Sequence, residues 1–256
     1  MKTLCLWTLK RLVSEEDASL AKKWVIEYDL DALLTTDGDG DRPLIADETG
    51  TWWRGDVLGL VCAKELGIEA LAIPVSCNTA VEKSGFFSRV TRTKIGSPYV
   101  IEAMEALSTD FGEVAGFEAN GGFLLGSDLT RDGKTLSALP TRDALLPALT
   151  VMVAAAKQGL PLSKMLEGLP ERYTASDRLK EFPTELSKKL IREWTDRPQS
   201  LADFLTLDSD IDSADVTDGL RVTLDCGDII HLRPSGNAPE LRCYPGLFMR
   251  PARKRR

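Results

Sequence analysis

The sequence predicts an α/β protein, a mixed sheet with helices on its faces, followed by a smaller α+β module at the C-terminal end. Up to about residue 160, apolar runs the length of strands alternate with stretches of helical periodicity, which is typical of layered sheets and helices. Beyond Gly159-Leu160-Pro161 the pattern changes to short alternating strands around a tight turn. We therefore expect a boundary within residues 160–170.

The first elements lead to an acidic loop. Ser14-Glu15-Glu16-Asp17 is typical of a helix start, because a capping serine precedes an acidic first turn. Residues 31–36 are an apolar run that predicts a buried strand, and the acidic loop begins at residue 37. Residues 56–66 then predict an apolar helix that ends at Gly67.

Strands and helices alternate over the next hundred residues. We expect strands over residues 71–75, 90–94 and 114–117, with a helix before the second of them. Ser97-Pro98 opens a helix to about residue 107, because proline is favoured at the first helical position. A long apolar helix is expected over residues 142–157.

The C-terminal module contains a predicted hairpin. Residues 172–179 predict a strand and residues 186–194 a helix. Residues 220–224 alternate in polarity, and a second strand over 229–233 follows a Cys226-Gly227-Asp228 turn.

Composition limits the class of protein. The 256 residues are 43% hydrophobic and 28% charged, the balance of an ordinary globular chain. A net charge of −7 and a pI near 5.0 argue against nucleic-acid binding, and the basic run at 250–256 is expected to be a solvated tail. No run of about 18 apolar residues is present to span a membrane. Five cysteines without a C-x-x-C pair are typical of reduced thiols, so we expect a cytoplasmic protein.

The most informative segment is Asp37-Gly38-Asp39-Gly40-Asp41-Arg42. Glycine lets the backbone fold tightly enough to bring the three carboxylates around one centre. Like charges this close require a cation, and hard oxygen ligands suit Mg²⁺ or Ca²⁺. Arg42 adds a planar fork for a phosphate or a neighbouring carboxylate. The loop therefore predicts a divalent metal site that works on phosphate.

The loop also permits three other interpretations. A calcium-binding helix–loop–helix is disfavoured because Arg42 and Pro43 stand where that loop needs glycine and smooth turns. The strand-terminal D-x-D is also similar to the loop of haloacid dehalogenase-type phosphatases, with Asp37 as nucleophile, but that family has Thr or Val where this chain has Asp41. A plain solvated turn does not explain three carboxylates interleaved with glycine.

A second polar turn lies near the C-terminal end. Arg233 and Arg242 flank Ser235-Gly236-Asn237 after a predicted strand. Backbone N–H groups in such a turn can converge on an anion, and arginine forks on both sides suit a phosphate dianion. A hairpin turn with exposed arginines is the alternative.

Two further turns carry polar groups. Lys94 stands before Gly96 at the end of a predicted strand, where a cation could meet a negative substrate. Glu118 and Asn120 lie in a glycine-rich turn and are suited to binding sugar hydroxyls.

In order and spacing, these four loops resemble those of the α-D-phosphohexomutases, the family of phosphomannomutases and phosphoglucomutases. That family has a D-G-D-x-D-R metal loop, a lysine-containing T-x-x-G loop, a G-E-x-S-G-H-type sugar loop and an R-x-S-G-T-E-P-x-x-R phosphate loop. The resemblance covers roughly residues 14–244. It implies a phosphohexomutase-type α/β fold, Mg²⁺ as cofactor and mannose or glucose phosphates as ligands.

The resemblance also implies roles for particular side chains. Asp37, Asp39 and Asp41 would hold Mg²⁺, and Lys94 and Arg42 would be the catalytic side chains. The residues expected to bind substrate are Glu118, Asn120, Arg233, Ser235, Gly236, Asn237 and Arg242.

The chain departs from the family pattern in several places. Asn120 and Gly122 replace the Ser and His of the sugar loop, and Asn237-Ala238 replaces Thr-Glu in the phosphate loop. The T-A-S-H-N-P-like segment that carries the phosphorylated serine does not occur in these 256 residues. The implied domains are residues 1–54, a remnant of domain 2 with the metal loop; 55–165, the sugar-binding domain 3; and 166–256, an incomplete phosphate-binding domain 4.

The expected activity is intramolecular phosphotransfer between O1 and O6 of a hexose, with these residues inactive on their own because the serine is absent. The alternatives are a Mg²⁺-dependent haloacid dehalogenase-like phosphatase and a non-catalytic sugar-phosphate-binding fragment. His231, the single histidine, is expected to be structural, so a Ser-His-Asp triad has little support.

Overall fold

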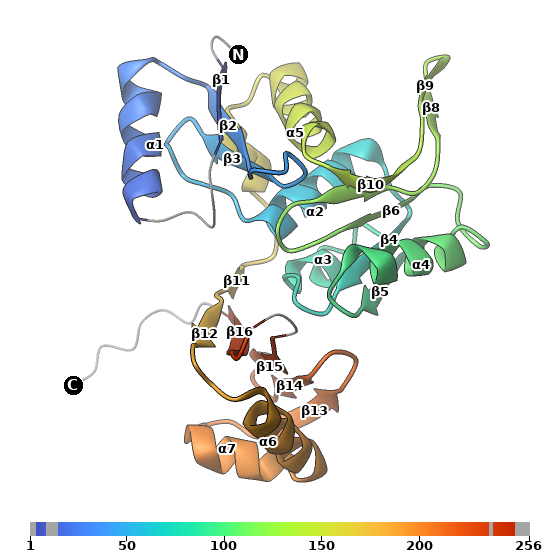
Figure 1. Ribbon diagram of the computed structural model, residues 1–256. Coiled ribbons are helices and arrows are strands. Elements are labelled where there is room, and N and C mark those ends of the chain that lie inside the picture. The colour runs from blue at the N-terminus through green and yellow to red at the C-terminus, as the bar shows by residue number, and fades with distance from the viewer. Residues whose placement is uncertain (1–3, 9–14, 236–237, 249–256) are drawn as a thin grey trace. The chain divides into compact units, whose positions relative to one another are not determined.

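The computed structural model describes residues 4–8, 15–235 and 238–248, and the chain divides into two compact units at residues 170 and 171 (Figure 1). The predicted α/β class is confirmed by its mixed sheets and covering helices. Within the described residues no helix is long and apolar enough to cross a membrane.

The first unit begins with a three-stranded sheet in the order β1-β2-β3. β2 (Ala32–Thr36) is parallel to β1 (Leu4–Thr8) and antiparallel to β3 (Pro43–Asp47). Helix α1 (Glu15–Glu27) buries Ala21 and Val25 against this sheet. The acidic loop of residues 37–42 is the connection between β2 and β3, so a paired strand holds it on each side.

A five-stranded sheet follows, in the order β10-β7-β6-β4-β5. Strand β4 is parallel to both of its neighbours, β5 and β6, while β7 and β10 add antiparallel pairs. The strands are β4 (Ala70–Pro74), β5 (Arg89–Thr93), β6 (Val114–Phe117), β7 (Phe123–Leu125) and β10 (Leu139–Asp143). Because β5 and β6 both run parallel to β4, the turns that carry Lys94 and Glu118 follow the carboxyl ends of these strands and lie at the same end of the sheet.

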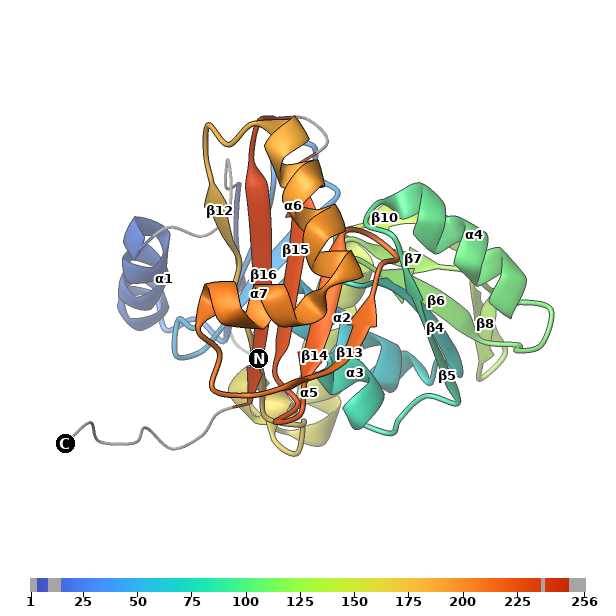
Figure 2. The same cartoon turned by 90° about the horizontal axis from the view of Figure 1, so that it is seen from below.

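Helices cover both faces of the five-stranded sheet (Figure 2). The larger core lies under α2 and α5, with Leu58, Phe117 and Val151 among its buried side chains. Helix α4 packs Val100 and Met104 on the opposite face. The helices are α2 (Gly55–Leu66), α3 (Ala80–Lys83), α4 (Ser97–Leu107) and α5 (Leu145–Gln158).

The stretch between Phe117 and α5 differs from the sequence prediction. It holds β7, a small hairpin of β8 (Leu129–Arg131) and β9 (Lys134–Leu136), and β10. The helix expected from residue 142 begins at Leu145, because residues 142 and 143 still belong to β10. The Asp143 carboxylate accepts hydrogen bonds from the Leu145 and Leu146 N–H groups, 2.7 and 3.1 Å away.

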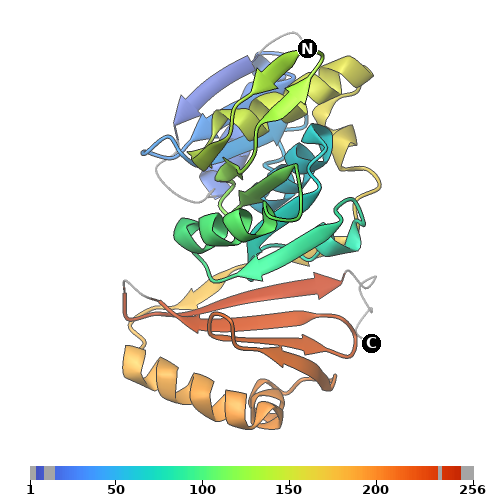
Figure 3. The same ribbon diagram turned by 90° about the vertical axis from the view of Figure 1, so that its right-hand side faces the viewer.

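The second unit is one antiparallel sheet with two helices along one face (Figure 3). In β14 the side chains of Leu220, Val222 and Leu224 are buried toward the helices, as the alternation predicts. The hairpin predicted around Gly227 is confirmed. The elements are β11 (Arg172–Thr174), β12 (Asp177–Leu179), α6 (Thr184–Asp196), α7 (Pro198–Leu205), β13 (Ile211–Asp215), β14 (Leu220–Leu224), β15 (Ile229–Pro234) and β16 (Leu241–Phe248). The single strand expected over residues 172–179 is two short strands, each paired with β16.

Candidate functional site

The acidic loop folds as a tight turn that gathers its carboxylates. The Asp37 N–H donates to the Arg42 carbonyl, and the Gly40 N–H donates to the Asp37 carbonyl, at 3.2 and 3.1 Å. Gly40 has φ = +75°, a conformation that strains a residue with a β-carbon. One carboxylate oxygen from each of Asp37, Asp39 and Asp41 lies within 4.8 Å of the others.

The carboxylates of this loop fit a hard divalent cation. Among the described residues, Asp37 Oδ1 and Asp41 Oδ1 are buried without a hydrogen-bond partner. A buried carboxylate oxygen without a hydrogen-bond partner destabilises the folded protein unless a cation binds it. An all-oxygen donor set suits Mg²⁺. Arg42 lies beside the loop, with Nη1 3.5 Å from Asp37 Oδ2 and Nε 3.7 Å from Asp41 Oδ1. The exiting element is a strand, so the calcium helix–loop–helix interpretation is wrong.

The turn after β6 holds the Glu118 carboxylate in place. The Glu118 N–H donates to the Gly122 carbonyl at 3.0 Å, and the Gly121 N–H donates to the Glu118 carbonyl at 2.9 Å. Asn120 Oδ1 accepts from the Gly122 N–H at 2.9 Å, and its Nδ2 lies 3.5 Å from Glu118 Oε2. Glu118 is only 5% exposed, so its side chain has one well-defined position.

The structure brings these two loops together. A β-carbon placed on Gly121 would lie 2.8 Å from the Pro43 carbonyl oxygen, so the two backbones are in contact. Arg142, on β10, joins the loops through charge: its Nη2 lies 2.8 Å from Asp41 Oδ2 and its Nη1 lies 3.4 Å from Glu118 Oε2. Sequence reasoning missed Arg142 because it placed residue 142 at the start of a helix. Asp143 is a good N-terminal capping residue. It could have indicated that the helix begins after residue 143 and that Arg142 belongs to a strand.

Lys94 lies at the end of β5, at the edge of the sheet where Glu118 also lies. Its Nζ is 5.6 Å from the centre of the Tyr99 ring, a cation–π distance. It lines an open hollow of about 770 Å³ along β5 and α4. In the described part of the chain Lys94 forms no ion pair with the carboxylates of either loop, so its catalytic role stays a prediction.

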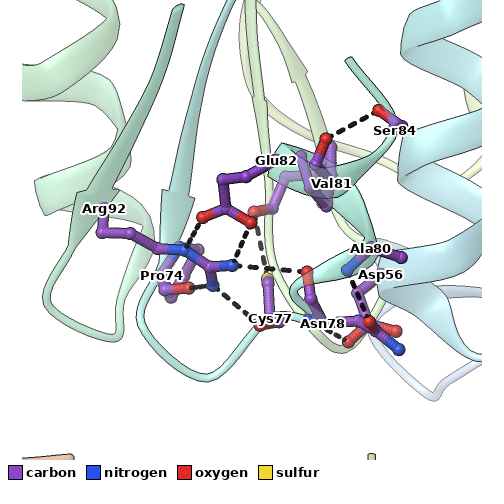
Figure 4. Close-up of polar contacts among 10 residues, drawn as sticks. Asp56, Pro74, Cys77, Asn78, Ala80, Val81, Glu82, Ser84 and Arg92 are labelled. Atoms are coloured by element: carbon purple, nitrogen blue, oxygen red, sulfur yellow. Dashed lines mark hydrogen bonds and ion pairs between the residues drawn. The ribbon is translucent and has the colours of Figure 1, made fainter. Parts of the chain in front are cut away.

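A second polar cluster, which the sequence did not reveal, holds the loop after β4 (Figure 4). Arg92 Nη1 donates to the Pro74 and Cys77 carbonyls at 2.9 and 2.7 Å, and its Nη2 donates to the Asn78 carbonyl at 3.3 Å. Glu82 pairs with the same guanidinium, with Arg92 Nε 2.6 Å from Glu82 Oε1. One arginine therefore holds three backbone carbonyls of the loop that follows β4.

Asp56 ties that loop to the start of α2. It is fully buried, accepts from the Asn78 N–H at 2.9 Å, and pairs with Arg54 at 3.1 Å. Burial raises the pKa of the adjacent Cys77 thiol well above its ordinary value. Cys77 therefore stays a neutral packing residue and cannot act as a nucleophile at neutral pH.

In the second unit two arginines flank the predicted phosphate turn. Arg233 and Arg242 are register partners on β15 and β16, and the Ser235 N–H closes the turn by donating to the Glu240 carbonyl at 2.8 Å. Arg233 pairs with Asp218 and Arg242 with Glu240, each at 3.4 Å. Gly236 and Asn237, also predicted to bind substrate, lie outside the described residues.

His231 is a buried structural residue. It is 1% exposed, and its Nε2 lies 2.6 Å from the Asp218 carbonyl oxygen, to which it donates. Burial lowers the pKa of its imidazole below the ordinary value, so the ring is neutral at pH 7. Its stacking neighbour is Tyr244, with ring centres 5.4 Å apart.

Comparison with known proteins identifies relatives of this chain. Residues 54–173 match the family model described as phosphoglucomutase/phosphomannomutase, alpha/beta/alpha domain III. A phosphomannomutase of Salmonella muenchen is 52% identical over 233 residues, which cover 91% of this chain and 48% of that protein. The chain spans about half the length of the curated relatives it matches.

Solved structures share the fold at low sequence identity. A phosphoglucomutase/phosphomannomutase family protein from Burkholderia thailandensis has a TM-score of 0.65 and 17% identity, with 90% of this chain and 46% of that one covered. Aspergillus fumigatus N-acetylphosphoglucosamine mutase, solved in complex with GlcNAc-6P and magnesium, has a TM-score of 0.55 and 16% identity, with 88% and 48% covered. With its acidic loop, its Glu118 turn and these matches, the chain belongs to the α-D-phosphohexomutase family of phosphoglucomutases and phosphomannomutases.

Proposed function

We propose that these residues supply the metal-, sugar- and phosphate-binding parts of a phosphohexomutase, which moves a phosphoryl group between O1 and O6 of a hexose. The observation that carries the proposal is the contact between the acidic loop and the Glu118 turn within one unit. A cation held by the acidic loop would then lie beside groups that can bind hydroxyls, as a sugar phosphate requires. The similarity to phosphomannomutases supports mannose or glucose phosphates as the substrates.

The acidic loop would act on the phosphoryl group. Asp37, Asp39 and Asp41 would hold Mg²⁺, whose charge offsets the negative charge of a phosphoryl group in transfer. The Arg42 guanidinium, beside two of these carboxylates, would attract phosphoryl oxygens that approach the loop. The magnesium complex of the Aspergillus mutase supports this choice of metal.

The other loops would bind and orient the sugar phosphate. Glu118 would accept hydrogen bonds from sugar hydroxyls, with Asn120 beside it, and Lys94 would transfer a proton to or from the reacting hydroxyl. Arg233 and Arg242 would hold the phosphate that is not reacting. The two arginines would recognise only the phosphate, and Glu118 and Asn120 would recognise only hydroxyls. The sugar phosphate could therefore bind in either of two orientations.

The phosphoryl carrier would come from elsewhere. No T-A-S-H-N-P-like segment occurs in the 256 residues, so we propose that these residues alone bind ligands without turnover. Activity would need a phosphorylated serine that gives its phosphate to the sugar and takes it back from the bisphosphate intermediate.

Cation binding is the direct test of the metal loop. Calorimetric titration with MgCl₂ should give one site for the 256-residue protein, and Asp37→Asn should weaken it by at least about tenfold. Asp110→Asn, an exposed carboxylate remote in sequence, makes the same change in charge and should leave the affinity within about twofold. An equal loss of Mg²⁺ affinity in both variants, or no Mg²⁺ binding by the wild-type protein, would contradict the proposed metal site.

Turnover is tested separately with mannose 1-phosphate and ³¹P NMR. We expect no mannose 6-phosphate from the 256 residues alone, and conversion once a phosphohexomutase N-terminal domain carrying the phosphorylated serine is added. Conversion without that domain would contradict the role assigned to the serine. Release of inorganic phosphate without isomerised sugar would instead favour the phosphatase.

A further inference from the structure

We propose that Arg142 is a positioning residue that couples cation binding at the acidic loop to the position of Glu118 in the sugar loop. The inference rests on the proposed function for the identity of the two loops. Its evidence is one side chain that contacts both: Nη2 of Arg142 lies 2.8 Å from Asp41 Oδ2, and Nη1 lies 3.4 Å from Glu118 Oε2.

The geometry suits an arginine and no other cation. A guanidinium presents two N–H groups in a fixed fork, whereas the lysine ammonium is a single point charge and cannot hold two separated carboxylates in one plane. The side chains of Arg142, Asp41 and Glu118 are 27%, 23% and 7% exposed. Water screens these contacts less than it screens a surface ion pair, so the coupling between them is expected to be measurable.

Gly122 makes room for Arg142. A β-carbon at position 122 would lie 2.7 Å from Cδ and 2.8 Å from Cγ of Arg142. The glycine is one of the places where the chain departs from the sugar loop it resembles, which has a histidine there. A side chain at position 122 would therefore have to displace the Arg142 side chain from the position in which it contacts both carboxylates.

Asp41 divides its two oxygens between Arg142 and the proposed cation. Its Oδ2 pairs with Arg142, while its Oδ1, 3.7 Å from Arg42 Nε, is buried without a hydrogen-bond partner among the described residues. A cation on Oδ1 draws electron density from this carboxylate and repels the guanidinium, which then pairs more strongly with Glu118. In the reverse direction, loss of the Glu118 charge lets Arg142 bind Asp41 more strongly and compete with the cation. Coupling of this kind is reciprocal by thermodynamic necessity.

A double-mutant cycle on Mg²⁺ affinity measures the coupling without any sugar. In the wild-type 256-residue protein, Glu118→Gln should weaken Mg²⁺ binding by about fivefold or more, because it frees Arg142 to compete. In an Arg142→Ala background the same substitution should change the affinity by less than about twofold. Arg142→Ala alone should tighten Mg²⁺ binding, since it removes a cation from Asp41.

Two further variants separate coupling from a general effect of charge or packing. Arg142→Lys keeps the charge but loses the fork, so the effect of Glu118→Gln should fall to less than about twofold in this background as well. Arg131→Ala removes an exposed arginine that pairs with Glu113 at 2.6 Å and should leave the effect of Glu118→Gln unchanged.

The outcome distinguishes this inference from the proposed function. Additive effects of the Glu118 and Arg142 substitutions, in a protein that still binds Mg²⁺, would overturn the coupling and leave the metal site standing. No Mg²⁺ binding in the wild-type protein would overturn both. If Arg142→Ala loses its circular dichroism signal, Arg142→Lys, which fills the same space, decides the case. Restoration of both the fold and the full effect of Glu118→Gln in the Arg142→Lys protein would show that Arg142 has a structural role and would overturn the coupling.

Discussion

Replacing Gly55 by alanine tests whether the start of α2 sets the position of the sugar loop. Gly55 is buried as the first residue of α2, and a β-carbon there would lie 2.2 Å from the Gly121 nitrogen and 2.6 Å from its Cα. It would also lie 2.5 Å from the Asn120 carbonyl carbon. All three atoms are backbone atoms, so no side chain can rotate away to relieve the overlap.

The expected cost follows from these contacts. Forcing an extra methyl group into a packed site costs typically about 1–3 kcal/mol, and contacts this short with backbone place Gly55→Ala near 3 kcal/mol. A loss of about 3 kcal/mol corresponds to a fall of about 6–12 °C in Tm for a domain of this size. Helix propensity alone predicts the opposite sign, because alanine is the better helix former.

Calorimetry and hydrogen exchange together make the assay. Tm is compared for the wild type, Gly55→Ala and the matched control Gly112→Ala, whose added β-carbon would meet only Glu69 Oε2, at 3.6 Å. The control should be neutral or stabilising by about 0.4–1 kcal/mol, because alanine restricts the unfolded chain. Exchange at the Gly121 N–H, which bonds the Glu118 carbonyl, should accelerate in Gly55→Ala. A Tm within about 2 °C of the wild type, or unchanged exchange there, would refute the reasoning.

Three other outcomes follow from the same structure. His231 has an ordinary pKa of 6.5 that burial lowers in the folded protein, so the unfolded chain takes up its proton first as pH falls. The free energy of unfolding should therefore decrease below pH 6.5, and urea titrations should show a smaller decrease in His231→Gln. Burial raises the pKa of the Cys62, Cys77 and Cys243 thiols, so among these and half-buried Cys226 iodoacetamide should modify Cys226 first in the native protein, as peptide mass spectrometry can establish. Arg92→Lys breaks a guanidinium contact to three backbone carbonyls and should lower stability by about 1–3 kcal/mol in denaturant titrations; an unchanged midpoint would contradict that role.

The order and type of many elements could be predicted because they depend on local patterns. The buried strand before Asp37, the helix ended by Gly67 and the hairpin around Gly227 each follow from apolar periodicity and a glycine in a left-handed conformation. No strand was predicted over residues 123–141, and the helix was predicted to start at residue 142, because the strands there are three to five residues long and, apart from β7, mostly exposed. Strands that short carry too few residues for a period to show.

The sequence by itself determined the acidic loop, since three carboxylates interleaved with glycine lie within six consecutive residues. It also indicated Glu118, which follows a strand, and the two arginines on either side of the Ser235 turn, which lie at strand ends. Only the tertiary structure decided what these groups touch. Arg142 reaches Asp41 and Glu118 from about 100 and 24 positions along the chain, since β10 and β6 are joined to the same sheet through β7. Which side chains share a site depends on strand order and on space such as that left by Gly122, and neither is recorded in the neighbouring sequence.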